Sequence, residues 1–328
     1  MNKVLVTGGC GFIGFHMIKR LITNNYKVLN LDFLGYASSK KDLNFKKNYQ
    51  FKKVDIKNFV KLKEVILDFS PDYILNFAAE SHVDNSIKDS SPFIYSNIVG
   101  TFNLLEISRG LKNNFKKFIH ISTDEVFGSL KLNTKKKFTE QSVYDPSSPY
   151  SASKASSDHL VKAWGRTYKT PFIITNCSNN FGPRQFHEKL IPVVINSCIN
   201  NCEIPIYGNG KNIRDWIYVE DHCEAIELII KKGKLFTQYL IGSRNNLSNI
   251  KLVKKICKIL DRIVPNKFGL KSYSELITFV KDRLGHDKRY SIEPGRIEKE
   301  LKWKPKHNFD SALLTTIKWY LNNKNYWK

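Results

Sequence analysis

Short apolar runs separated by longer mixed segments make up the first half of the chain. Such runs form strands buried on both faces of a sheet, and the segments between them are long enough for helices. The runs predict strands around 4–6, 28–31, 51–54, 72–77, 118–122 and 172–175, with one helix ending near 23 and a long helix through 97–101. This alternation indicates an α/β fold with a Rossmann-type, doubly wound parallel sheet.

The pattern changes after residue 176. Residues 179–183 are rich in turn formers, 190–194 begin another helix, and 214–221 return to a strand. We expect residues 1–176 to form a nucleotide-binding domain to which parts of about 210–245 return. Residues 177–328 should mainly form a smaller C-terminal substrate-binding domain.

Three glycines, Gly8, Gly11 and Gly14, follow the first expected strand and open the first helix. Glycines in this spacing allow a tight turn, close approach to a pyrophosphate and helix–strand packing, while the helix N-terminus supplies N–H donors. Asp32 ends the next strand, where its carboxylate would accept a hydrogen bond from an adenosine ribose hydroxyl. Because an acid there would repel a 2′-phosphate, the pattern predicts NAD rather than NADP.

Hydroxyl and carboxyl side chains, Thr123, Asp124 and Glu125, follow the strand 118–122 directly. Tyr150 and Lys154 then lie one turn apart on a helix that Pro149 can begin and that Ser147 or Ser148 can cap. The lysine and the helix dipole would both stabilise a phenolate, so we expect Tyr150 to act as a base below its ordinary titration range. The Tyr and Lys spacing alone is common on solvated helix faces, but here a nucleotide motif and a carboxyl pair accompany it, which predicts a proton-transfer site.

Composition narrows the class of protein. The 328 residues carry a formal net charge of +23, but the lysines come in small groups along the whole chain, so we expect a solvated basic surface and no nucleic-acid partner. The six cysteines lack metal-binding spacing, which favours reduced thiols and no metal site. No apolar run approaches the roughly 20 residues that span a bilayer, and the chain opens in a strand, so we expect a cytoplasmic protein without a membrane partner.

Eight segments together resemble a known family. They are 7–14 (TGGCGFIG), 78–84 (AAESHVD), 122–126 (STDEV), 149–155 (PYSASKA), 176–180 (NCSNN), 188–192 (EKLIP), 214–222 (RDWIYVEDH) and 282–287 (DRLGHD). The chain resembles the extended short-chain dehydrogenase/reductases and, within them, the branch that dehydrates nucleotide sugars. The adjacent Asp124 and Glu125 are the most specific feature of this resemblance, because related epimerases and decarboxylases usually lack that pair.

The resemblance implies an NAD-dependent lyase that converts dTDP-glucose to its 4-keto-6-deoxy product. Tyr150, beside Lys154, would take the proton of the 4-hydroxyl that Thr123 holds. Glu125 would remove the C5 proton and a protonated Asp124 would donate to the departing 6-hydroxyl. Hydride would pass from C4 to NAD and return to C6 of the same sugar.

The same resemblance implies two sets of binding residues and a homodimer through helices around 92–110 and 149–168. The NAD set is Gly8, Gly11, Phe12, Ile13, Gly14, Asp32, Asp55, Ile56, Phe77, Ala78, Ala79, Ser96, Tyr150, Lys154 and Asn180. The nucleotide-sugar set is Ser81, Thr123, Asn179, Lys189, Leu190, Pro205, Ile206, Tyr207, Arg214, Asn249, Asp282 and His286.

The chain departs from the family pattern at a few positions, and alternatives stay open. Asn85 stands where bacterial members usually carry Arg, Phe127, Arg184 and Leu284 also differ, and the chain stops at Lys328. The residues alone leave thymine, uracil or another base open. The rival functions are a nucleotide-sugar epimerase or decarboxylase of the same superfamily, and a non-catalytic NAD-binding regulator.

Overall fold

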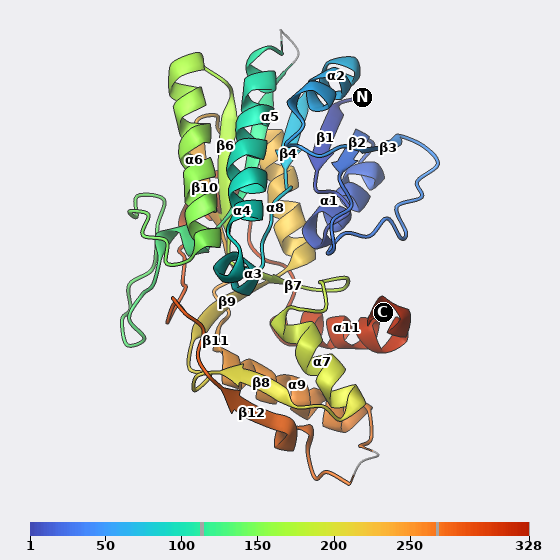
Figure 1. Cartoon of the computed structure of the whole chain (residues 1–328), viewed down its shortest axis with the longest axis vertical. Coiled ribbons are helices and arrows are strands. Elements are labelled where there is room, and N and C mark those ends of the chain that lie inside the picture. Colours follow the sequence, from blue (N-terminus) through green and yellow to red (C-terminus); the bar gives the residue numbers. More distant parts are fainter. Residues whose placement is uncertain (112–114, 267–268, 328) are drawn as a thin grey trace.

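A parallel sheet with helices on both faces forms the larger part of the molecule (Figure 1). The computed structural model describes residues 1–111, 115–266 and 269–327, and within them seven strands join this sheet in the order β10-β6-β5-β4-β1-β2-β3. The strands are β1 (Lys3–Thr7), β2 (Lys27–Asp32), β3 (Tyr49–Lys53), β4 (Tyr73–Asn76), β5 (Lys117–Thr123), β6 (Phe172–Cys177) and β10 (Thr237–Ile241). Neighbouring strands pair in parallel throughout, which confirms the predicted doubly wound, Rossmann-type fold.

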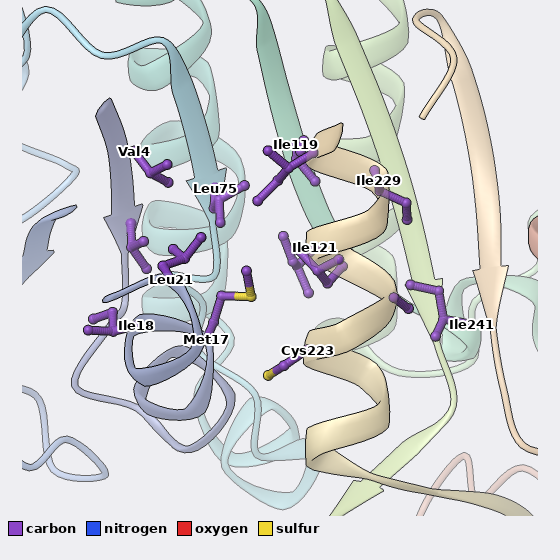
Figure 2. Close-up of a cluster of buried hydrophobic side chains, with 14 of the residues drawn as sticks. Val4, Met17, Ile18, Leu21, Leu75, Ile119, Ile121, Cys223, Ile229 and Ile241 are labelled. Atoms are coloured by element: carbon purple, nitrogen blue, oxygen red, sulfur yellow. The ribbon is translucent and has the colours of Figure 1, made fainter. Parts of the chain in front are cut away.

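Two helical layers cover the sheet, and each buries one set of alternating strand residues. Val4 and Val6 of β1 pack in a core with α1 (Phe12–Thr23) and α8 (Val219–Lys232), part of which is seen in Figure 2. Leu5 instead belongs to the core on the other face, formed with α2 (Phe59–Phe69), α5 (Gly100–Arg109) and α6 (Pro149–Tyr168). Successive strand side chains point to opposite faces, so an uninterrupted apolar run is what a doubly covered strand requires.

The long helix expected through 97–101 is built from three consecutive pieces. They are α4 (Ser91–Phe93), the π-helical turn η1 (Ile94–Val99) and α5. Within the π turn, Asn97 donates to the Ser153 hydroxyl on α6 at 2.8 Å and exchanges hydrogen bonds with the backbone of Glu80. The wider turn thus joins α6 to the loop after β4, and π turns of this kind often accompany functional sites.

The smaller part of the molecule contains two short sheets, with strand orders β11-β9-β7 and β12-β8 among the described residues. Its strands are β7 (Asn179–Phe181), β8 (Ile204–Tyr207), β9 (Ile213–Tyr218), β11 (Asn246–Ser248) and β12 (Ile277–Val280). Its helices are α7 (Leu190–Asn200), α9 (Asn249–Ile263) and α11 (Phe309–Asn322), with 3₁₀ turns η3 (Tyr273–Leu276) and η4 (Lys324–Trp327). A separate apolar core holds these elements together.

Segments beyond residue 177 also pack on the large sheet. β10 is its edge strand, α8 covers one face, and α10 (Gly295–Leu301) packs against β10 and α8.

The strand expected over 214–221 is wrong in its second half, because β9 ends at Tyr218 and Val219 begins α8. The carboxylates of Glu220 and Asp221 stand in the first turn of that helix, where the helix dipole favours negative charge. The division of the chain into domains at residue 176 stays a prediction.

Across the described part of the chain, none of the helices combines the length and the apolar character needed to cross a membrane. All six cysteines are free. In the same part of the chain, His, Cys, Asp and Glu side chains form no group of three or more that could hold a metal ion.

Candidate active site

A cavity lies at the carboxyl ends of the parallel strands, beside the point where the sheet order reverses between β1 and β4. Ligands bind at this position in open α/β sheets. The predicted site residues found in its wall are Gly8, Gly11, Phe12, Ile13, Asp32, Asp55, Ile56, Phe77, Ala78, Ala79, Ser81, Ser96, Thr123, Asp124, Glu125, Tyr150, Lys154, Asn179, Asn180 and Lys189. The fold therefore brings into one space all five predicted catalytic residues and all of the predicted NAD set except Gly14, but only four of the nucleotide-sugar set, Ser81, Thr123, Asn179 and Lys189.

The remaining predicted residues lie outside that wall. They are Gly14, Leu190, Pro205, Ile206, Tyr207, Arg214, Asn249, Asp282 and His286. Gly14 is a packing residue, because a Cβ there would stand 2.3 Å from the Gly8 carbonyl oxygen. Three of the others form a second group, in which the Tyr207 ring lies 6.3 Å from that of His286 and His286 bonds Asp282 at 2.7 Å. Their roles toward a ligand stay predictions.

The turn between β1 and α1 has the shape of a dinucleotide cradle. Gly8 has φ +69, and a Cβ on it would stand 2.7 Å from the Ala78 backbone nitrogen, so only glycine fits. Gly11 caps α1 without a side-chain hydrogen bond from any described residue, which leaves helix N–H groups directed at the cavity. Asp32 is held in place by the backbone N–H groups of Cys10 at 2.9 Å and Leu34 at 2.8 Å. These features fit the adenosine and pyrophosphate of a dinucleotide.

The carboxyl pair follows the end of β5 in the 3₁₀ turn η2 (Asp124–Phe127), which the Thr123 hydroxyl caps by accepting from Glu125 N at 3.2 Å. Asp124 is buried, and burial, with the Glu125 and Asp215 carboxyls, raises its pKa well above the ordinary value. Burial also raises the pKa of Glu125, although the Arg214 guanidinium opposes that rise. Because Asp124 Oδ2 has no hydrogen-bond partner among the described residues, Asp124 is suited to carry a proton toward a ligand.

The helix that carries Tyr150 and Lys154 begins as predicted, with Pro149 in its first turn. Of the two proposed caps, Ser148 is the one used: it accepts from Ser151 N at 3.1 Å, and Ser151 Oγ accepts in return from Ser148 N at 3.0 Å. The other candidate, Ser147, instead donates to Asp287 Oδ1 at 2.6 Å.

The expectation that Tyr150 titrates below its ordinary range is wrong for this structure. Burial, followed by the nearby Glu125 carboxyl, raises the pKa of Tyr150 well above its ordinary value. Burial also lowers the pKa of Lys154 to about 8, and its Nζ donates to the Ile121 carbonyl oxygen at 2.8 Å. The spacing predicted the stabilising charge, but it contained no measure of burial, which acts in the opposite direction.

Several residues near the chemistry were missed by sequence reasoning. The Tyr290 hydroxyl donates to Asp287 Oδ2 at 2.5 Å and lies 3.4 Å from Glu125 Oε2. Glu188 accepts from the Tyr36 hydroxyl at 3.1 Å and lines the cavity. Glu188 and Asp287 stand inside the family segments, which was the available signal. Tyr290 and Tyr36 lie outside them, and only folding brings them to the site.

Two of the departures from the family pattern have clear places in the structure. Asn85 donates to the Tyr36 hydroxyl at 3.3 Å, and that hydroxyl donates to Glu188 of the cavity wall at 3.1 Å. The Arg184 guanidinium lies 3.8 Å over the Phe15 ring and bonds Asp42 Oδ2 at 2.7 Å, so it secures the loop after Asp32.

Comparison with known proteins identifies the family. Residues 5–316 match the family model of GDP-mannose 4,6 dehydratase. The dTDP-glucose 4,6-dehydratase of Neisseria meningitidis is 47% identical to 100% of this chain and 96% of its own length. The solved dTDP-glucose 4,6-dehydratase of Bacillus anthracis, in complex with NAD, superposes with a TM-score of 0.89 at 38% identity over 100% of this chain and 99% of its own.

A second solved enzyme, dTDP-glucose 4,6-dehydratase from Streptomyces venezuelae with NAD and TDP bound, has a TM-score of 0.90 at 36% identity, covering 99% of each chain. The likeness spans the cradle, the carboxyl pair and the smaller sheets alike. The chain therefore belongs to the nucleotide-sugar 4,6-dehydratase family of the extended short-chain dehydrogenase/reductases.

Proposed function

We propose that this chain is an NAD-dependent lyase that converts dTDP-glucose to dTDP-4-keto-6-deoxyglucose and water. The observation that carries the proposal is the adjacent pair of Asp124, which is buried, and Glu125, which is half-buried, beside Tyr150 in the cavity that holds the dinucleotide cradle. Loss of water between C5 and C6 needs a base for one carbon and an acid for the next. Two close carboxyls, one of them buried, retain one proton between them, and so supply both.

The cofactor proposal rests on the fit of the cradle. Gly8, Gly11 and the N-terminus of α1 would hold the pyrophosphate, Asp32 the adenosine ribose, and Asp55 and Ile56 the adenine. The hydride acceptor for C4 and the hydride donor for C6 would be NAD held in this cradle, so that no cofactor would be consumed. The NAD complexes of matched dehydratases support this assignment.

Oxidation at C4 falls to Tyr150, Lys154 and Thr123. Thr123 would hold the 4-hydroxyl while the Tyr150 phenolate takes its proton. Burial opposes ionisation of Tyr150, so positive charge must offset it, and Lys154, one helical turn away, is the chain's own source of that charge.

Elimination falls to the carboxyl pair. The C4 ketone acidifies the C5 proton, which Glu125 takes, while Asp124 gives its proton to the departing 6-hydroxyl. Arg214 favours the ionised form of Glu125, and burial with two neighbouring carboxyls keeps Asp124 protonated. The two groups therefore begin the step in the opposite proton states that it requires.

The nucleotide part of the substrate needs positive charge and hydrogen-bond donors. Lys189 lines the cavity, and Arg214 is oriented by the carbonyl oxygens of Ile213 and Asp287, both at 2.9 Å. We assign the diphosphate to these two cations. Ser81, Asn179, Leu190, Pro205, Ile206, Tyr207, Asn249, Asp282 and His286 complete the proposed nucleotide-sugar surface.

The test is incubation of the purified protein with dTDP-, UDP- and GDP-glucose, followed by mass spectrometry and NMR of the products. We expect dTDP-glucose to lose one water and gain a C6 methyl group. A product of unchanged mass would instead show an epimerase, loss of carbon dioxide from UDP-glucuronate, added as a fourth compound, a decarboxylase, and absence of turnover on all four a regulator.

We also propose a cytoplasmic homodimer. Phe102 on α5 packs edge-on against Trp164 on α6 with centroids 5.8 Å apart, so the two helices form one continuous surface. Ile94, Tyr95 and Phe102 expose 42%, 57% and 40% of their area there. Apolar surface gathered on two packed helices is typical of a helix-mediated contact between copies.

A further inference from the structure

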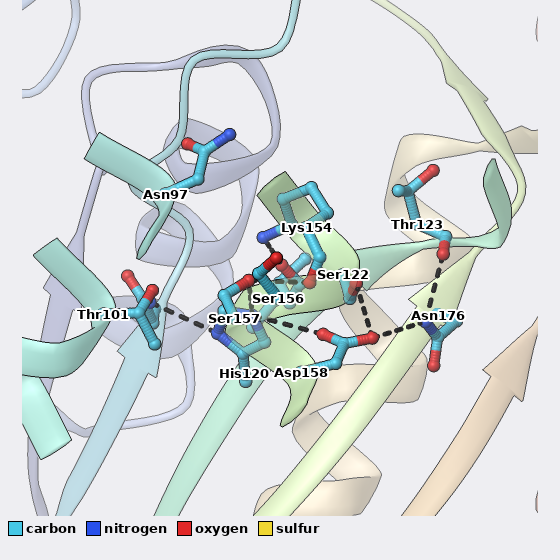
Figure 3. Close-up of polar contacts among 12 residues, drawn as sticks. Asn97, Thr101, His120, Ser122, Thr123, Lys154, Ser156, Ser157, Asp158 and Asn176 are labelled. Carbon is cyan, nitrogen blue, oxygen red and sulfur yellow. Dashed lines mark hydrogen bonds and ion pairs between the residues drawn. The ribbon is translucent and has the colours of Figure 1, made fainter. Parts of the chain in front are cut away.

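A buried carboxylate lies behind the proposed proton-transfer site. Asp158 is on α6, one turn after Lys154, is fully buried and stands behind the cavity wall. Its Oδ2 accepts from Ser122 Oγ at 3.0 Å, the Tyr144 hydroxyl at 2.8 Å and Asn176 Nδ2 at 3.2 Å; Figure 3 shows its bonds to Ser122 and Asn176. Burial raises the pKa of Asp158, and Lys154 together with these three donors, which meet on one oxygen, favours the ionised carboxylate against that rise.

The group facing the other oxygen is also a donor. The Asn76 amide oxygen accepts from Thr7 Oγ1 at 2.7 Å, so its nitrogen faces His120 Nδ1, at 3.2 Å, and donates to it. The imidazole proton is therefore on Nε2, which donates to Ser157 Oγ at 3.1 Å; Asp158 Oδ1 lies 3.4 Å away and has no hydrogen-bond partner among the described residues. Burial holds the pKa of His120 well below its ordinary value, so the ring is neutral and leaves the carboxylate charge in place.

The charge of Asp158 needs a cation, and Lys154 is the buried cation one turn earlier on the same helix; the two side chains form no direct ion pair in the described structure, where Lys154 Nζ donates to the Ile121 carbonyl oxygen at 2.8 Å. Lys154 is 3% exposed, and its burial would release its proton near neutral pH without a nearby anion. The other titratable groups packed around the pair are Tyr144, His120, Lys162 and Cys177. Lys162, one turn after Asp158, lies 4.7 Å from the centroid of the Tyr144 ring and donates to the Tyr144 hydroxyl, the group that bonds Asp158, at 3.5 Å.

We infer that Asp158 is the counter-ion that keeps Lys154 protonated, and hence a positioning residue for proton transfer at Tyr150. The attraction between the two charges raises the pKa of Lys154 against the lowering that burial causes. Asn176 adds a mechanical link, because its Nδ2 donates both to Asp158 and to the Thr123 carbonyl oxygen, at 3.0 Å. The inference rests on the proposed base role of Tyr150 and extends it to a residue that touches no substrate.

The test is the pH profile of kcat/KM for Asp158→Asn in the full chain. The alkaline limb reports loss of the Lys154 proton, so we expect it to move to lower pH by about one unit or more, a tenfold change in proton affinity. We expect kcat to fall while KM for dTDP-glucose stays within about twofold, since Asp158 lies behind the wall.

Tyr144→Phe is the matched control, because it removes a hydrogen bond to the same oxygen and leaves the charge; its alkaline limb should stay in place. Asp158→Glu, which keeps the carboxylate, should also keep the limb. The inference would be overturned if the alkaline limb of the kcat/KM profile did not move in Asp158→Asn, or if it moved by the same amount in all three variants. So would failure of both position-158 variants to fold while Tyr144→Phe folds, because it would show a structural role. Absence of turnover in the unaltered protein would instead refute the proposed function.

Discussion

At the scale of single residues, neighbouring carboxyls with different environments decide the chemistry. Asp124 and Glu125 are adjacent in sequence, yet the Arg214 guanidinium is the largest influence after burial on the pKa of Glu125, whereas for Asp124 the Glu125 and Asp215 carboxyls outweigh it. Their order along the chain says nothing about that difference. It arises because β9 carries Arg214 to the end of β5.

Glu125→Gln should leave substrate and cofactor binding in place and slow the elimination by about 10²–10⁴-fold, because it deletes the base and retains the shape. The measurement is exchange of the C5 proton with deuterated water, followed by NMR alongside product formation. C5 exchange at the rate of the unaltered protein would rule Glu125 out as the base. Asp124→Asn is the matched comparison, since it removes the acid and should allow C5 exchange to continue.

Asp124→Asn should also stabilise the protein, increasingly so as pH rises. Folding raises the pKa of the Asp124 carboxyl, so the folded protein favours its protonated form. The contribution of Asp124 to the free energy of unfolding is therefore fully present below its unfolded pKa. That contribution is lost as the pH rises from the unfolded pKa toward the folded pKa. In that window the unaltered protein loses about 1.4 kcal/mol of its free energy of unfolding per pH unit. The amide in Asp124→Asn does not titrate, so the variant avoids this loss. Urea unfolding at pH 5, 6, 7 and 8 measures it, and a variant whose stability tracks that of the unaltered protein would contradict the prediction.

At the scale of elements, polar groups at helix ends hold the frame around the site. Lys117, the first residue of β5, donates through Nζ to the carbonyl oxygens of Ile229, Ile230 and Gly233, at 2.9–3.1 Å. One ammonium thus satisfies the C-terminal end of α8 and ties it to the central strand. Periodicity predicted β5, but the partner of Lys117 lies more than a hundred residues further along.

Lys117→Met should lower the free energy of unfolding by about 1–3 kcal/mol, because three partly buried carbonyls lose their charged donor while the apolar stem remains. Lys116→Met is the control: its ion pair with Asp72 is largely exposed and should contribute less than about 1 kcal/mol. Urea titration gives both values. Similar losses in the two variants would show that the helix-end contact has no special weight.

Gly8→Ala should abolish NAD binding, since the added methyl meets the Ala78 backbone in a conformation that L residues rarely adopt. Isothermal titration of the purified protein with NAD measures this directly. Gly110→Ala is the comparison, because Gly110 has negative φ and a Cβ would make only ordinary contact with the Ile107 carbonyl oxygen, at 3.4 Å. Unchanged NAD affinity in Gly8→Ala would remove the turn from the proposed cofactor site.

At the scale of the whole molecule, the chain should be dimeric through η1, α5 and α6. Tyr95→Asp combined with Phe102→Asp should give a monomer in light scattering, because it places charge at the centre of the apolar surface. Leu67→Asp, on α2 and 47% exposed, is the control and should leave the dimer intact. A monomeric unaltered protein, or a dimer that survives the double change, would contradict the proposed interface.

What the sequence determined by itself is what short-range physics controls. The apolar runs specified a doubly covered parallel sheet, because each strand must bury both faces; the spacing of Gly8, Gly11 and Asp32 specified the cradle, because one turn and one strand end create it. Pro149 and Ser148 set the start of α6, and with it the shared face of Tyr150 and Lys154. The resemblance of the family segments added the proposed catalytic roles, which stay predictions.

The tertiary structure decided what depends on burial and on distant partners. The raised pKa of Tyr150, the contact of Tyr290 with Glu125 and the bond of Lys154 to the Ile121 carbonyl oxygen all arise from elements more than thirty residues apart or from depth in the core. The same holds for the end of β9 at Tyr218, where α8 begins because its apolar face packs against the large sheet. Desolvation grows with the packing of the whole fold, so no local pattern contains it.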